Sequence, residues 1–312
     1  MISPHQLTKL DLVITNDPSE SSLPTAVEPP VLQDPPLTPI PASRVNPWWD
    51  VFVAFMAWLG SIGLLLFVPL IAVIPYFVYL MVKGRAPTAD AFAQNKTFLF
   101  LSVVSVIPAH LLTLLGAWLI VTRRGKRKFW QTLKVSWPES WAAWQGIAVC
   151  FGIAVVLLSL GALVTKFLGG GKTDLDQLIE SSFAARIATA ILAVATAPLV
   201  EEIIYRGMLY PALQRLLGMS WAVVVVTVMF ASVHVPQYLN NIGVILVITA
   251  LSVVLTLIRA KTDRLLPSIV IHLIFNGIQS LIILAEPFIE KPEKVETAPT
   301  FILLSRVIRH LF

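Results

Sequence analysis

The chain contains long apolar stretches that carry no Asp, Glu, Lys or Arg, among them residues 52–82 and 98–121. A run of about 20 apolar residues is long enough to cross the hydrocarbon core of a bilayer as a helix. Of the 312 residues, 56% are hydrophobic and 13% are charged, whereas about a quarter of the residues in a soluble domain are charged. The sequence therefore predicts an all-α fold, a polytopic bundle of transmembrane helices.

Apolar stretches of this kind recur along the chain, and we expect about seven spans. The first is too long for one perpendicular crossing, so we expect a kink at Pro69 or Pro75, a tilt, or an extension beyond the membrane. Eight spans are the alternative, if the amphipathic residues 301–312 help to complete another element, although we expect those residues to lie on the membrane surface. The predicted spans are 50–82, 98–122, 142–165, 186–217, 219–235, 241–258 and 265–285.

The segments around these spans differ in composition and divide the chain into four parts. Residues 1–47 hold 10 of the 22 prolines, which predicts a disordered tail. Residues 48–141 comprise the N-terminal membrane helices and a connector, 123–141, whose bases and aromatic side chains suit the membrane surface. Residues 142–285 form the helical core of the protein, and residues 286–312 form a tail with a short amphipathic helix.

Lys and Arg lie mainly in the loops beside the spans, so the net charge of +5 does not predict a nucleic-acid partner. Positive residues are enriched in cytoplasmic loops, and with seven spans ten of them fall on one side and six on the other. This asymmetry predicts an integral protein of the plasma (inner) membrane with a cytoplasmic N-terminus. The ten are Arg123, Arg124, Lys126, Arg127, Lys128, Lys134, Arg215, Arg259, Lys261 and Arg264, and the six are Lys83, Arg85, Lys96, Lys166, Lys172 and Arg186.

Few ionisable side chains lie inside the predicted spans, and those few indicate a functional site. A carboxylate or guanidinium near the bilayer centre costs about 2.5–3.5 kcal/mol on insertion scales, so such groups usually face the bundle interior and serve a function. A lone histidine is more often a core residue with a satisfied hydrogen bond, and we interpret His110 in this way. The ionisable residues inside the spans are His110, Glu201, Glu202, Arg206, His234 and His272.

The segment around the two adjacent glutamates suggests that the two carboxylates have different functions. On a helix, Glu202 and Arg206 are four residues apart and lie on one face, where they can neutralise each other. Glu201 points about a quarter turn away and remains available for chemistry. Pro198 weakens the backbone hydrogen bonding of the helix, and the bend that results makes room for water beside Glu201. A structural salt bridge alone would not need the second glutamate.

Two later spans add imidazoles and an amide. His234 follows Phe230 by one helical turn, and His272 precedes Asn276 by one turn. With Glu201 these groups provide what hydrolysis needs: a base for water, imidazoles to position the water or bind a metal, and an amide that can donate to an oxyanion. A Zn²⁺ ion held by Glu201, His234 and His272 is chemically reasonable, as is a metal-free mechanism that uses Glu201 with His234, and the sequence does not choose between them.

Residues 201–206 (EEIIYR), 230–234 (FASVH) and 272–276 (HLIFN) resemble the three ordered motifs, EExxxR, FxxxH and HxxxN, of the CPBP family. This family comprises CAAX prenyl proteases and bacteriocin-processing (ABI) intramembrane endopeptidases. The resemblance covers about residues 142–285 and implies a helical bundle with its active site inside the membrane. It also implies that Glu201 activates water, that Glu202 and Arg206 complete its motif, and that His234 acts beside it.

For the third motif, the resemblance implies that His272 and Asn276 stabilise the oxyanion, or that His272 binds metal. We therefore expect an intramembrane endopeptidase that cleaves a membrane-associated or prenylated, CAAX-like protein or a leader peptide. One alternative is a non-catalytic membrane scaffold or immunity protein of the same fold. A proton-coupled transporter is a weaker alternative, because the chain shows no internal repeat. The expected partners are a peptide or protein substrate at the membrane and the lipid bilayer, with no nucleic acid.

One geometric expectation remains open. At about 1.5 Å per residue, Glu201 lies ~24 Å from the cytoplasmic end of its predicted span. By the same rule, His272 lies only ~9 Å from the cytoplasmic end of its own. The two side chains can meet only if the span boundaries differ from those given above or if the two helices begin at different depths.

Overall fold

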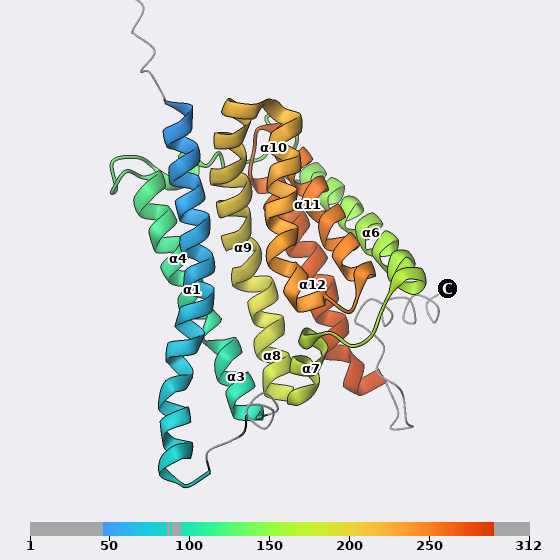
Figure 1. Cartoon of the computed structure of the whole chain (residues 1–312). Coiled ribbons are helices and arrows are strands. Elements are labelled where there is room, and N and C mark those ends of the chain that lie inside the picture. The colour runs from blue at the N-terminus through green and yellow to red at the C-terminus, as the bar shows by residue number, and fades with distance from the viewer. Residues whose placement is uncertain (1–45, 86–87, 89–94, 290–312) are drawn as a thin grey trace, which may run out of the picture. The chain divides into compact units, whose positions relative to one another are not determined.

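The structure is a computed structural model that describes residues 46–85, 88 and 95–289 (Figure 1). Within these residues the regular secondary structure is entirely helical, and the all-α prediction is confirmed. The predicted disordered tail lies outside the described residues except at its end, and so does most of the predicted C-terminal tail. The helices are α1 (Pro47–Val82), α3 (Lys96–Val104), α4 (Val106–Val121), α5 (Phe129–Thr132), α6 (Ala143–Leu168), α7 (Asp174–Ser181), α8 (Phe183–Ile191), α9 (Ala197–Glu201), α10 (Tyr210–His234), α11 (Ile242–Thr262) and α12 (Leu266–Ile289).

Three short segments depart from α-helical geometry, and all of them lie in the second half of the chain. Two are π-helical, η1 (Leu192–Thr196) and η2 (Glu202–Leu209), and one is a 3-10 turn, η3 (Val235–Tyr238). The π-helical segments are continuous with α8, α9 and α10, so one long rod of helix carries the EExxxR motif.

Six helical stretches of the described residues are long and apolar enough to cross a membrane. One of them, Phe183–Tyr238, has 56 residues and is interrupted at Gly218, whose φ of 77° and ψ of 172° are not helical. The chain reverses direction there, so that the two halves of the stretch run side by side (Figure 1). Counted as two crossings, this stretch brings the number to seven, and the polytopic helical bundle is confirmed.

The first helix remains continuous through its prolines. α1 has 36 residues and contains both Pro69 and Pro75. Its length is about 54 Å at 1.5 Å per residue, well above the ~30 Å thickness of a bilayer core. Tilt or extension beyond the membrane therefore accounts for the length of this helix without a break.

Close helix packing forms the core around the motif residues. Gly243 of α11 lies against α6 so tightly that a Cβ atom there would be 3.1 Å from the Leu168 carbonyl oxygen and 3.1 Å from Thr165 Cα. Small residues at helix contacts let membrane helices approach each other closely. On the other side of the core, Phe230 and Ile203 are buried together in the cluster that joins η2 to α10.

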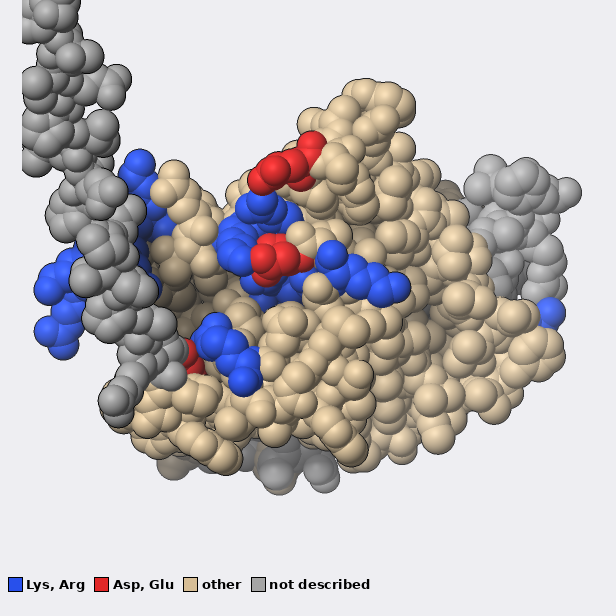
Figure 2. Space-filling model, turned by 90° about the horizontal axis from the view of Figure 1, so that it is seen from above, with Lys and Arg blue, Asp and Glu red and all other residues tan. Residues whose placement is uncertain are grey.

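One end of the bundle carries a cluster of basic residues (Figure 2). The connector between α4 and α6 is fastened here, because Lys134 forms an ion pair with Asp263, which also accepts a hydrogen bond of 2.9 Å from Arg259. Partial burial acts to raise the pKa of Asp263, but the hydrogen bonds from Lys134 and Arg259 hold it below its ordinary value. Arg264 pairs with Glu139 of the connector at 2.9 Å.

The same end of the molecule explains how Glu201 and His272 meet. A Cβ atom on Gly207 would lie 3.4 Å from Leu265, the residue that precedes α12. Gly207 is therefore level with the start of α12, and the helix continues for ten more residues before the reversal at Gly218. The two helices begin at different depths, which is the second of the possibilities stated above.

Candidate active site

The helix that carries the two glutamates is widened on both sides of Glu201. In η1 the Ala197 amide donates to the Leu192 carbonyl, five residues earlier, and α9 then begins with Pro198 in its first turn. η2 starts at Glu202, directly after Glu201. A π turn holds one more residue than the hydrogen-bond pattern of an α-helix allows, and such turns often occur at functional sites. The departure from α-helical hydrogen bonding thus lies just before Pro198, the residue at which the sequence predicted a bend.

Glu202 and Arg206 form a fully buried ion pair, with 0% of either side chain exposed. The Arg206 Nη1 atom donates to Glu202 Oε1 at 3.0 Å, as the spacing of four residues predicts. Buried charges are tolerated only when they are paired and hydrogen-bonded. This pair therefore needs the further contacts that surround the guanidinium.

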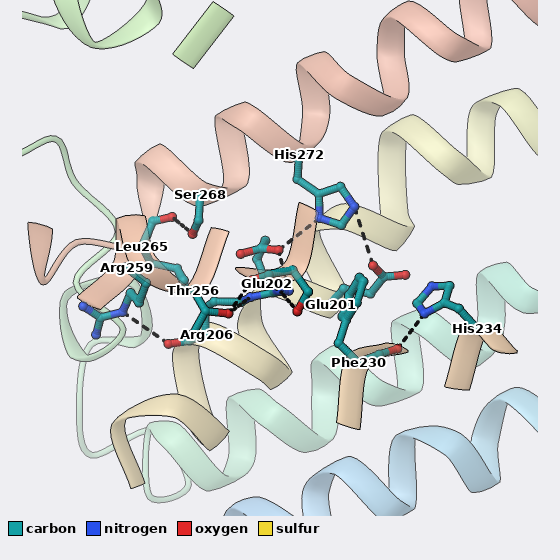
Figure 3. A network of polar contacts seen from close by, with 11 residues as sticks. Glu201, Glu202, Arg206, Phe230, His234, Thr256, Arg259, Leu265, Ser268 and His272 are labelled. Atoms are coloured by element: carbon teal, nitrogen blue, oxygen red, sulfur yellow. Dashed lines mark hydrogen bonds and ion pairs between the residues drawn. The ribbon is translucent and has the colours of Figure 1, made fainter. Parts of the chain in front are cut away.

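Those further contacts come from α11 and from two aromatic rings. Arg206 Nη2 donates to the Ser252 hydroxyl at 2.8 Å and to the Ser252 carbonyl at 3.1 Å, and Nε donates to Thr256 Oγ1 at 3.2 Å (Figure 3). The guanidinium carbon lies 4.6 Å from the centre of the Phe230 ring and 5.7 Å from that of Tyr205. Protein groups therefore satisfy Arg206 on every side, and its ion pair holds the Glu202 carboxylate in place.

His272 of α12 contacts both glutamates. Its Nδ1 atom lies 3.0 Å from Glu202 Oε1, and its Nε2 atom lies 3.7 Å from Glu201 Oε2 (Figure 3). A carboxylate only accepts hydrogen bonds, so Nδ1 carries the proton that Glu202 accepts. The Nε2 atom then faces Glu201 and is available for a proton, a water molecule or a metal ion.

Glu201 differs from Glu202 in being partly open. Its side chain is 24% exposed, against 0% for Glu202. Among the described residues no hydrogen bond holds its carboxylate, and His272 is 3.7 Å away. Electrostatic interactions link it to His110, Tyr205 and Tyr238. A partly exposed carboxylate among polar groups of four different elements is well suited to act on water.

His234 lies at the end of α10, where Phe230 orders it. The His234 Nδ1 atom is 2.7 Å from the Phe230 carbonyl oxygen, which can only accept, so Nδ1 is protonated. Its Nε2 atom has no hydrogen-bond partner in the part of the chain that the structure describes. The Phe230 ring is 4.6 Å from the His234 ring and 6.3 Å from the His272 ring. Phe230 thus packs against His234 on one side and Arg206 on another. The sequence analysis did not predict these contacts.

Asn276 does not join this network in the described part of the chain. Its Nδ2 atom donates to the Ala193 carbonyl oxygen of η1 at 3.0 Å. The π turn supplies this acceptor, because its altered hydrogen bonding leaves carbonyls without their usual helical partners. Asn276 therefore ties α12 to η1, and the second N–H of its amide remains for the predicted oxyanion contact.

The predicted metal ligands have suitable donor atoms but are not gathered into a closed set. In the described part of the chain, no three His, Cys, Asp or Glu residues are grouped as a metal site. The Nε2 atoms of His272 and His234 have no hydrogen bond among the described residues. The Glu202 carboxylate at His272 Nδ1 and the Phe230 carbonyl at His234 Nδ1 are typical supports of zinc-binding histidines. Two ligands of a tetrahedral Zn²⁺ ion lie roughly 3.3 Å apart, close to the 3.7 Å between His272 Nε2 and Glu201 Oε2.

The sequence analysis assigned His110 to the core of the bundle. The structure places this residue beside the site. It is buried in α4, and its Nδ1 atom lies 2.8 Å from Thr196 Oγ1, within η1. Its only sequence signal is its position inside an apolar span, which cannot distinguish it from an ordinary core histidine.

The comparison with known protein families identifies part of the chain. Residues 183–278 match the type II CAAX prenyl endopeptidase Rce1-like family. This segment runs from α8 to α12 and contains all three motifs, in agreement with the CPBP resemblance. Neither the curated proteins nor the solved structures include a match to the chain.

Proposed function

From the premise that residues 183–278 form an Rce1-like type II CAAX prenyl endopeptidase domain of the CPBP family, we propose that Glu201 is the base of an intramembrane protease. The substrate of this protease is a membrane-associated or prenylated, CAAX-like protein, or a leader peptide. In more general terms the chain is an integral membrane endopeptidase that acts on a protein substrate at the membrane. The cleavage chemistry, the substrate and the plasma-membrane location with a cytoplasmic N-terminus belong to the proposal.

The observation that carries the proposal is the contrast between the two adjacent glutamates. Glu202 is neutralised by Arg206 and held by His272, whereas Glu201 is 24% exposed and has no hydrogen bond in the described part of the chain. A general base must reach the proton that it removes. Of the two carboxylates, only Glu201 has the access to water that this step requires.

In the proposed reaction, Glu201 removes a proton from a water molecule while the water oxygen attacks the carbonyl carbon of the scissile peptide bond. The carbonyl electrons move to its oxygen, and a tetrahedral oxyanion forms. When the oxyanion collapses, the carbon–nitrogen bond breaks and the proton held by Glu201 passes to the leaving amine. Exclusion of bulk water from the helical bundle strengthens each electrostatic contact along this path.

The other motif residues serve this reaction in different ways. The unprotonated Nε2 atom of His234 can accept a hydrogen bond from the attacking water. His272 in its doubly protonated form offers an Nε2–H that can donate to the water or to the oxyanion. Asn276 has one N–H in addition to the one given to Ala193. Glu202 and Arg206 act indirectly, because they fix the ring of His272 and do not touch the substrate.

The alternative is a zinc-dependent form of the site, for which the side chains present have suitable donor atoms. Glu201, His234 and His272 would hold the ion, with the Glu202 carboxylate and the Phe230 carbonyl behind the two rings. The ion would supply a polarised water at neutral pH. Metal analysis of the purified protein, combined with activity before and after chelation, distinguishes the two forms: a stoichiometric metal whose removal abolishes cleavage supports the zinc site.

Replacement of Glu201 tests the proposal. In Glu201→Gln the side chain keeps its size but cannot accept the proton, so we expect cleavage of a membrane-embedded peptide to fall by at least about 100-fold. Lipidated and unlipidated versions of one peptide, followed by mass spectrometry, also reveal which substrate class is used. The variant should insert into the membrane and fold as the parent does.

The result also separates the protease from a scaffold or immunity protein of the same fold. If Glu201→Gln cleaves at the rate of the parent protein, Glu201 is not the base. If the parent cleaves no peptide but still binds or protects against a partner, and Glu201→Gln does so equally well, the scaffold alternative replaces the protease.

A further inference from the structure

A buried histidine outside the matched domain faces the same site. His110 lies on α4, 73 residues before the family match begins at residue 183, so none of the three motifs includes it. Only 4% of the residue is exposed. Burial of an imidazole among apolar helices is unfavourable unless its nitrogens find partners. Both ring nitrogens of His110 are therefore expected to interact with polar groups.

The first contact fixes which ring nitrogen carries the proton. His110 Nδ1 lies 2.8 Å from Thr196 Oγ1. The Thr196 hydroxyl has one other acceptor, the Leu192 carbonyl oxygen, but that atom is 3.5 Å away and already accepts from the Ala197 amide. A good O–H hydrogen bond spans about 2.5–3.0 Å, so the hydroxyl donates to Nδ1. The proton of the neutral ring is therefore on Nε2.

The second contact joins His110 to the reactive carboxylate. α4 packs against both η1 and α9, the elements that contain Thr196 and Glu201. Across this packing of α4 against α9, the charge of Glu201 acts on His110. No direct hydrogen bond joins the two side chains, and Nε2 has no hydrogen-bond partner among the described residues. Two polar groups that interact without a direct hydrogen bond can be bridged by a water molecule.

We propose that His110 is a positioning residue of the proteolytic site: Thr196 fixes its tautomer, and its Nε2–H stabilises the carboxylate of Glu201 through an intervening water. The inference rests on the proposed function for its effect on turnover. It extends the site from the matched domain to the N-terminal helices, because α4 then supplies a group without which Glu201 is poorly oriented. Thr196 acts through His110 and links the π turn η1 to the chemistry.

Three substitutions at one position separate the two nitrogens of His110. In His110→Gln the amide N–H can reach the position of Nε2, in His110→Asn it reaches only the position of Nδ1, and His110→Leu offers neither. Loss of a group that orients a reactive side chain typically lowers activity by about 10–100-fold. We expect that loss in kcat for the Asn and Leu variants, with KM little changed and with most of the activity restored in Gln.

A matched control lies one turn along the same helix. Thr113 is also buried in α4, and among the described residues its hydroxyl bonds only to the Ala109 carbonyl, at 2.9 Å. Thr113→Val removes a buried polar group from α4 without touching the site, so its kcat should equal that of the parent. Equal kcat for the parent, His110→Asn and His110→Leu would overturn the inference.

A second measurement needs no substrate. The melting temperatures of His110→Leu, Glu201→Gln and the double variant in detergent form a double-mutant cycle, which reports whether the two side chains interact. We expect the double variant to melt at least about 2 °C above the value that additive shifts give, whereas Thr113→Val with Glu201→Gln should be additive. Additive shifts for His110 and Glu201 would overturn the inference. A parent protein that cleaves nothing would overturn the proposed function alone, and the melting cycle would then decide the inference.

Discussion

Arg206 is a charged side chain with no exposed surface, and Glu202 is the carboxylate that neutralises it among the described residues. In Arg206→Leu the Glu202 charge loses its ion pair while it remains buried. Removal of one member of a buried pair costs about 3–5 kcal/mol, whereas replacement of both members by apolar groups is often neutral. We therefore expect Arg206→Leu to unfold at a much lower temperature in detergent and Glu202→Leu/Arg206→Leu to recover most of the loss.

An exposed ion pair of the same molecule provides the control for this experiment. Arg215 pairs with Asp50 at 2.8 Å, but their side chains are 49% and 34% exposed. Exposed pairs are worth about 0–1 kcal/mol, so Arg215→Leu should melt close to the parent. If Arg206→Leu is as stable as Arg215→Leu, the buried pair does not hold the fold together.

For individual residues, the sequence predicted the ion pair of Glu202 and Arg206 but not the contacts of the site that join distant parts of the chain. The spacing of four residues between Glu202 and Arg206 was sufficient to predict their contact, because helix geometry is local. The contact between His110 and Thr196, and that between Asn276 and Ala193, join residues more than 80 positions apart. No local periodicity encodes such contacts, since they depend on how whole helices pack.

Among the elements, the reversal at Gly218 separates two antiparallel helices without any loop. Its φ of 77° and ψ of 172° fall in a region that is nearly restricted to glycine, and a side chain there costs about 1–3 kcal/mol. We expect Gly218→Ala to lower the stability by this amount, measured as a decrease in melting temperature. A Cβ atom would meet nothing within 4 Å, so strain of the backbone is the only cause.

Gly152 is the matching position within a regular helix. It lies in α6, and a Cβ atom there also meets nothing within 4 Å. Because alanine is up to about 1 kcal/mol better than glycine inside a helix, Gly152→Ala should be neutral or slightly stabilising. If Gly218→Ala and Gly152→Ala lower the stability equally, backbone strain at Gly218 is not the cause of the loss.

The elements themselves were more predictable than their internal geometry. Each of the seven predicted spans corresponds to a helical stretch, and the predicted break at residue 218 lies at the reversal. The interruption of the second span at Ser105 and the two π segments were not predicted. Hydrophobic length indicates that a helix crosses the membrane, but the hydrogen-bond register within it depends on the neighbouring helices.

For the whole molecule, the basic end of the bundle predicts the orientation (Figure 2). The only cysteine, Cys150, is buried, so maleimide labelling of introduced cysteines has a low background. Lys126 is exposed at the basic end, and Gly171 is exposed beyond the opposite end of α6. With a cytoplasmic N-terminus, an impermeant maleimide added to intact cells should label Gly171→Cys, and should label Lys126→Cys only after the membrane is opened. The reverse pattern would place the N-terminus outside.

Convergence of distant helices is the part of the site that only the whole structure shows. The sequence analysis expected Glu201, His234 and His272 to meet in one site but could not give their geometry. The bundle brings His272 within 3.0 Å of Glu202 and 3.7 Å of Glu201. The catalytic functions of these residues, and of His234 and Asn276, stay predictions until the substitutions are made.

The π turn η1 has a consequence for how this chain tolerates changes in length. A turn with an amide bonded five residues back contains one residue more than regular α-helix needs. Deletion of Ala195 would let the helix close into uniform α-helical register, and because the wide turn absorbs its extra residue, the segment beyond it would keep nearly the same rotation relative to α8. Glu201 would keep its direction, whereas the Ala193 carbonyl that accepts from Asn276 would be taken up by a backbone amide of the regular helix. The extra residue between Phe183 and Glu201 is thus a requirement of the Asn276 contact rather than of the direction of the glutamate.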